Sequence, residues 1–134
     1  MWFQSCDIET IGAGYVTANG RDAANNTSYY DFNKARINGT SGVASTYLGH
    51  PWRDYSRVVF QRSYLSGVVN PAGWSEWNGL NETENVFYRE YENYGPGAAG
   101  PRVSWSGQLR KEIRIKEIFG EGYKEEGWID GSYL

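Results

Sequence analysis

The apolar positions of this chain fall into short runs that turn-forming residues separate. Clusters rich in glycine, asparagine and proline favour turns, whereas β-branched and aromatic residues favour pleated strands. No stretch before residue 110 keeps a helical period of apolar positions. The pattern predicts strands over residues 2–8, 15–18, 28–37, 57–65, 85–91 and 102–105.

Apolar residues fall on both faces of some of these strands, as in residues 85–91 (NVFYREY). Such strands are covered on both sides, by a core on one and by loops or a ligand on the other. The strands recur at unequal intervals, which fits a solenoid with loops of variable length, and a β-sandwich is the competing interpretation. The apolar positions of residues 109–119 fit neither the helical nor the strand period well, and they predict a terminal strand or a short helix. We expect Trp128 to dock the end of the chain through its ring.

Composition and charge narrow the classes of protein that this chain can represent. Its 134 residues are enough for one domain, with 17 Gly, 6 Trp and 11 Tyr in agreement with strands and turns. A net charge of −3 without a basic stripe argues against a nucleic-acid partner. The longest apolar runs are too short to cross a membrane, and any secretion signal would lie upstream of Met1. A single cysteine, Cys6, excludes an internal disulfide.

Polar residues that could carry chemistry are few. No Gly-x-Ser-x-Gly elbow occurs, and His50 is the only histidine. Asp7 and Glu9 share one face of a predicted strand and could form an acid–base pair. The favoured interpretation is that both lie on a solvated face of the strand. Glu76 lies between two tryptophans, which could raise its pKa. The favoured interpretation is a polar residue at the rim of the aromatic surface.

Three tryptophans follow a turn that contains proline or glycine, namely Trp52, Trp74 and Trp77. A ring at such a position is expected at a loop tip, where its flat face can stack on the C–H face of a sugar. Packing at a turn of the solenoid explains Trp77 equally well and Trp52 less well. The tryptophans therefore predict a carbohydrate-binding surface.

Several motifs resemble, in order, those of the pectin methylesterases (pectinesterases). Residues 47–57 (YLGHPWRDYSR) are similar to the Leu-Gly-Arg-Pro-Trp signature of that family. The other matching segments are residues 2–8 (WFQSCDI), 14–21 (GYVTANGR), 29–34 (YYDFNK), 70–77 (NPAGWSEW) and 90–98 (EYENYGPGA). The resemblance implies one all-β domain over residues 1–134. It would be the C-terminal coils of a right-handed parallel β-helix, with residues 110–134 as an irregular tail that packs on the solenoid.

The resemblance also implies an activity. The family is a group of secreted carboxylic ester hydrolases that act on methyl-esterified homogalacturonan in cell walls. An aspartate attacks the ester carbonyl, a second aspartate acts as general acid and then base, and glutamines stabilise the oxyanion. No cofactor or metal is implied. Sequons at Asn25, Asn26, Asn38 and Asn81 agree with an extracellular glycoprotein.

The chain departs from the family pattern at two points. It resembles only the part that follows both aspartates and the oxyanion glutamines, so no residue here is assigned a catalytic role. The signature arginine, which holds the nucleophilic aspartate, is replaced by His50. Arginine binds a carboxylate with two parallel hydrogen bonds and is always charged. Each histidine nitrogen makes only one such hydrogen bond, and the imidazole is mostly neutral at pH 7. The resemblance assigns substrate contacts to His50, Trp52 and Trp74.

These inferences lead to competing functional hypotheses. The first is a pectin methylesterase whose present chain is inactive by itself and would have the N-terminal half of the same domain as its partner. The second is a non-catalytic β-helix protein that binds pectin or another polysaccharide. A third, a polysaccharide lyase, would need a calcium site of clustered acids, and none stands out in the sequence.

Overall fold

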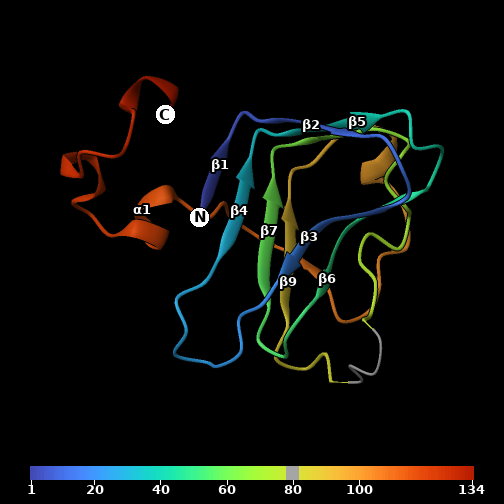
Figure 1. The fold of residues 1–134 in the computed structure, drawn as a ribbon, viewed down its shortest axis with the longest axis horizontal. Helices are drawn as coiled ribbons and strands as arrows, with labels where there is room; N and C mark the ends of the chain where they lie inside the picture. Colours follow the sequence, from blue (N-terminus) through green and yellow to red (C-terminus); the bar gives the residue numbers. More distant parts are fainter. Residues whose placement is uncertain (78–81) are drawn as a thin grey trace.

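A computed structural model describes residues 1–77 and 82–134 and shows three parallel β-sheets wound into a β-helix (Figure 1). The first two turns of the solenoid each contribute one strand to every sheet, and later turns extend the first and second sheets, so strands that are distant in sequence become neighbours. The largest sheet runs in the order β1 (Trp2–Gln4), β4 (Tyr30–Asn33), β7 (Arg57–Gln61), β9 (Phe87–Tyr91) and β10 (Gly107–Gln108). The second holds β2 (Asp7–Thr10), β5 (Arg36–Gly39) and β8 (Tyr64–Leu65), and the third β3 (Gly14–Asn19) and β6 (Thr46–Pro51). The predicted parallel β-helix is confirmed.

Sharp corners divide three of the predicted strands into two. Residues 2–8, 28–37 and 57–65 each contain a strand of the first sheet, a corner, and a strand of the second. The corner residues Ser5, Lys34 and Arg62 have φ of 53°, 56° and 49°, in the left-handed region that residues with a side chain rarely adopt. The amide of each corner donates a hydrogen bond to a carbonyl of the next coil, such as Lys34 N to Gln61 O at 3.0 Å. The solenoid ladder therefore continues through its corners.

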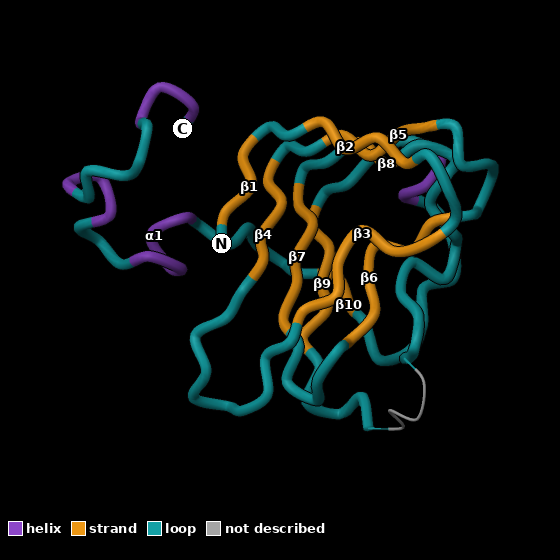
Figure 2. Tube along the Cα trace, viewed as in Figure 1, coloured by secondary structure: helices purple, strands orange, loops and turns teal. Residues whose placement is uncertain are grey.

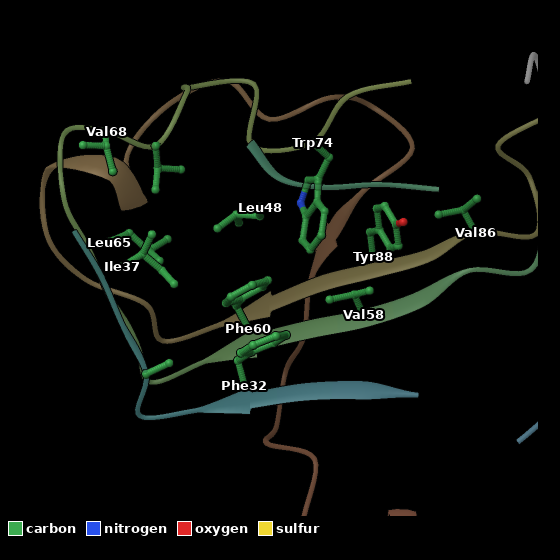
Figure 3. Close-up of a cluster of buried hydrophobic side chains, with 12 residues drawn as sticks. Phe32, Ile37, Leu48, Val58, Phe60, Leu65, Val68, Trp74, Val86 and Tyr88 are labelled. Atoms are coloured by element: carbon green, nitrogen blue, oxygen red, sulfur yellow. The ribbon is translucent and has the colours of Figure 1, made fainter. Parts of the chain in front are cut away.

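Aromatic rings in register stack inside the solenoid (Figure 3). Phe3, Phe32 and Phe60 occupy matching positions on β1, β4 and β7, and successive ring centroids lie 4.4 Å apart and nearly parallel. This distance is close to the strand spacing of a sheet, so the parallel register itself produces the stack. Trp74 and Tyr88 extend the buried cluster with centroids 4.3 Å apart.

An ion pair closes the core at its C-terminal end. The next register position after Phe60 is Glu90 on β9, which is 2% exposed. Arg102 donates two hydrogen bonds to this carboxylate, at 2.8 and 3.1 Å, and others to the carbonyls of Pro71 and Gly97. The expected strand over residues 102–105 is wrong, because this segment crosses the end of the solenoid as a cap and the next strand is β10.

The C-terminal segment leaves the solenoid and lies beside β1 (Figures 1 and 2). The side-chain amide of Gln61 pairs with the backbone of Ile113, at 2.8 and 2.9 Å, which fixes the start of this tail on the first sheet. Of the two expectations for residues 109–119, the short helix is correct, as α1 (Ile115–Phe119). Trp128 packs edge-on against Phe119 at 5.3 Å and remains 65% exposed. Short 3₁₀ turns complete the structure at Pro96–Ala98, Tyr123–Glu125 and Gly131–Tyr133. Within the described ranges, no helix has the length and apolar character that crossing a membrane requires.

Candidate functional site

The segment with the only histidine forms β6, a strand that the sequence pattern did not predict. β6 pairs in parallel with β3, so that Tyr47 lies beside Tyr15, and His50 beside Ala18. Gly49 allows this close pairing, because a Cβ there would overlap the hydroxyl of Thr17. That hydroxyl donates a hydrogen bond of 2.9 Å to the carbonyl of Leu48, between the two strands.

His50 is held between aromatic rings. Its imidazole is stacked on the indole of Trp77, with centroids 4.1 Å apart and planes 15° from parallel. The Tyr15 ring meets it edge-on at 4.6 Å. His50 is 4% exposed, and its Nδ1 atom is buried without a hydrogen-bond partner. Stacking and edge contacts therefore hold this ring on the side where Nδ1 makes no hydrogen bond.

The surroundings of His50 favour its neutral form. Burial lowers the pKa of His50 below its ordinary value of 6.5, and the nearby Pro51 carbonyl opposes this only in part. Among the described residues, no carboxylate makes a hydrogen bond or an ion pair with His50. The imidazole in this chain is thus an uncharged aromatic group near neutral pH.

Trp52 lies at the exposed edge of the aromatic cluster that it forms with Tyr15, His50 and Trp77. Its ring is 51% exposed and faces Trp77 at 5.7 Å, with planes 29° apart. The backbone around it is fixed, since Trp52 N donates to the carbonyl of Asn19 at 3.0 Å. The Asn19 side chain in turn accepts hydrogen bonds from the amides of Arg21 and Arg57, at 3.2 and 3.0 Å. A rigid loop therefore presents an open aromatic face, as the sequence predicted for this residue.

Trp74 does not share that face. It is 1% exposed and packs on Tyr88 in the core, which disagrees with the expectation that it contacts substrate (Figure 3). The physical reason is the preceding turn, in which Gly73 adopts φ of 73°. After this turn the backbone of Trp74 pairs with Gly49 of β6 in a parallel β-bridge. The tryptophan that joins the cluster is Trp77, for which the sequence left surface and packing roles open.

The carboxylates form no acid–base pair in the described parts of the chain. Asp7 and Glu9 are exposed on β2, and Glu76 is also exposed, in agreement with the solvated interpretations. Besides Glu90, whose carboxylate is paired with Arg102, a second acid is buried, namely Asp31, which the sequence pattern did not single out. Burial raises its pKa from 3.8 to about 8, while the Met1 ammonium and the Gln61 amide act in the opposite direction. An acid between aromatic residues within a strand (YYDF) was the available signal.

Known proteins resemble this chain over nearly all of its length. The sequence model of the family described as Pectinesterase matches residues 1–129. A pectinesterase of Aspergillus niger is 38% identical over 99% of this chain, which spans 42% of that relative. The crystal structure of a deglycosylated A. niger pectin methylesterase superposes with a TM-score of 0.87 at 34% identity, over 98% of this chain and 44% of the other. Pectin methylesterase from carrot gives a TM-score of 0.80 at 34% identity, over 92% of this chain and 45% of the other. The chain spans less than half of these relatives, and it belongs to the pectinesterase family.

Proposed function

We propose that this chain forms part of the substrate-binding face of a pectin methylesterase, which hydrolyses methyl-esterified homogalacturonan. Water would convert each methyl ester into a galacturonate carboxylate and methanol. The observation that carries this proposal is the exposed ring of Trp52 beside His50, in a chain that matches the pectinesterase family over residues 1–129. A flat exposed indole suits the C–H face of a sugar ring.

The described residues support binding more directly than catalysis. Ester hydrolysis through a covalent intermediate needs a nucleophile, a proton donor and donors for the oxyanion. The rings of Tyr15 and Trp77 contact the His50 ring, and no carboxylate of the described chain is paired with it. We therefore propose that the 134-residue chain binds pectin without hydrolysing it. The catalytic carboxylates would come from the N-terminal half of the same domain.

An extracellular location in the cell wall is part of the same proposal. Homogalacturonan is a wall polymer, so an enzyme acting on it must be secreted. Three of the sequon asparagines, Asn25, Asn26 and Asn38, are exposed and accessible to a glycan. The fourth, Asn81, lies outside the described residues.

Two measurements on the same samples test this function. Affinity electrophoresis in gels with highly esterified pectin measures binding, and methanol release from that pectin measures hydrolysis. We expect the chain to be retarded, the Trp52→Ala variant to lose most of the retardation, and no sample to release methanol. Trp128→Ala is the matched control, because Trp128 is 65% exposed and packs on Phe119 in the tail.

The outcomes test the binding face and the absence of hydrolysis separately. If Trp52→Ala and the unmodified chain are retarded equally, the proposal that Trp52 belongs to a pectin-binding face is refuted. Methanol release would show that this chain itself hydrolyses esters, against the proposed division of roles. A non-catalytic pectin-binding protein remains the second candidate, since the aromatic surface around His50 requires no hydrolysis to bind a sugar.

A further inference from the structure

Trp77 lies at the centre of the aromatic cluster rather than at its edge. Its indole is stacked on His50 at 4.1 Å, faces Trp52 at 5.7 Å, and meets Tyr15 edge-on at 6.4 Å. By comparison, Trp52 and His50 are 6.4 Å apart and tilted by 44°. Trp77 is therefore the ring through which the exposed Trp52 and the buried His50 are connected.

We propose that Trp77 is the positioning residue of this site: its indole face fixes the plane of the side chain at position 50 and extends the sugar-stacking surface of Trp52. This inference rests on the proposed function for the part that concerns sugar. The part that concerns His50 stands on the geometry of the rings alone.

The first step of the argument is that His50 has little else to hold it. A side chain with two rotatable bonds keeps one orientation when hydrogen bonds or packing exclude the others. The buried Nδ1 of His50 has no hydrogen-bond partner, so packing must provide that restriction. Trp77 covers one face of the imidazole in a parallel stack, and Tyr15 contacts it edge-on. Tyr15 carries a phenol, which is a titratable group, and its ring is in contact with that of His50.

The second step concerns the kind of group that this arrangement accepts. An indole face attracts planar cations, and a guanidinium stacks on it as readily as an imidazolium. The same Trp77 face can thus hold a histidine or an arginine at position 50. We therefore expect the His50→Arg variant to fold normally and to keep its side chain on Trp77.

The third step concerns the surface itself. The planes of Trp52 and Trp77 are 29° apart and their ring centroids are 5.7 Å apart, so a sugar that contacts Trp52 lies close to Trp77 as well. Trp77 is half-buried and Trp52 is 51% exposed, so a sugar ring on this face has Trp52 as its main contact. Removal of Trp77 would weaken pectin binding by releasing Trp52 and by shortening the face.

The single histidine allows a direct test by proton NMR, because the C2 proton of His50 gives one resonance of its kind. A stacked indole shifts that resonance upfield, and the burial that it provides keeps the pKa of His50 low. In Trp77→Ala we expect the resonance to move downfield and the titration midpoint of His50 to rise towards 6.5. Trp77→Phe, which keeps a ring over the imidazole, should retain most of both effects. Trp52→Ala is the matched control and should change neither by much, because Trp52 is 6.4 Å from His50.

The outcomes are decisive for the positioning role. An unchanged chemical shift and midpoint in a folded Trp77→Ala variant would overturn the proposal. If that variant does not fold, the unmodified chain still decides the matter. A nuclear Overhauser contact between the His50 C2 proton and the Trp77 indole supports the stack, and its absence refutes it. None of these readouts involves pectin, so a failure of the unmodified chain to bind pectin refutes the proposed function and leaves this result standing.

Discussion

Replacement of Asp31 by asparagine is expected to change how the stability of this chain depends on pH. Asp31 lies on β4 with no exposed surface, and its Oδ1 atom accepts a hydrogen bond of 3.1 Å from Gln61 Nε2. The Oδ2 atom is buried without a partner. Burial of an acid in this way penalises the charged form and favours the protonated one.

The direction of the effect follows from proton linkage. Burial raises the pKa of Asp31 from 3.8 to about 8, so the folded chain keeps a proton that the unfolded chain releases above about pH 4. Folding stability therefore falls as the pH rises from about 4 to about 8. At about 1.4 kcal/mol per pKa unit, the full loss is at most about 6 kcal/mol, and about 2.7 kcal/mol of it falls between about pH 5 and about pH 7.

Urea unfolding of the chain and of Asp31→Asn at about pH 5, 6, 7 and 8 measures this effect. Asparagine has no proton to lose and can still accept the hydrogen bond from Gln61, so the variant should gain on the unmodified chain as the pH rises. His50 is present in both proteins, and its contribution cancels in the difference. The Met1 ammonium interacts with Asp31, so its contribution is part of the difference that is measured. Asp7→Asn removes an equal charge from an exposed position of β2 and should give a flat difference. A flat difference for Asp31→Asn as well would refute the reasoning.

Three further changes test the packing of the solenoid by urea or thermal unfolding. Arg102→Ala leaves the carboxylate of Glu90 buried and unpaired and should cost about 3–5 kcal/mol, with a far smaller loss for the exposed Arg110→Ala. Phe60→Ala removes one ring of the stacked ladder and should also cost about 3–5 kcal/mol, whereas Phe60→Leu should cost less than half of that. Lys34→Val places a β-branched residue at a φ of 56° and should cost about 1–2 kcal/mol, whereas Lys34→Gly should be close to neutral. A neutral Lys34→Val would show that this corner is not fixed in the left-handed region.

Strand composition predicted four of the five strands of the first sheet, but neither β10 nor the corners. The apolar runs around Phe3, Phe32 and Phe60 lie where β1, β4 and β7 form, because their side chains fill one core. The same runs continue without a glycine or a proline through Ser5 and Lys34, although the chain turns sharply there. Local sequence does not mark these corners, since the hydrogen bonds that hold them come from the next coil.

The candidate site was predicted in part. The motif at residues 47–57 led to His50 and Trp52, and both are in the aromatic cluster. The distinction between Trp74 and Trp77 was beyond the sequence, because both indoles follow the same turn within a few residues. The register of Trp74 against Gly49 of the preceding coil decides which of them enters the core. Contacts between coils, which have no local signature, determine this part of the site.

The environment of His50 also explains what the departure from the Leu-Gly-Arg-Pro-Trp signature changes. A histidine that merely replaced an arginine as a cation would need solvent or a carboxylate to keep its proton near neutral pH. His50 has neither in the described chain, since it is 4% exposed and no carboxylate there forms an ion pair with it. An arginine on the same Trp77 face would keep its charge, because its pKa is far above that of histidine. Compared with an arginine at this position, His50 therefore lacks a permanent positive charge, and it keeps a planar group stacked on Trp77. Under the proposed function, binding of a neutral methyl ester would tolerate that loss better than stabilisation of a carboxylate nucleophile would.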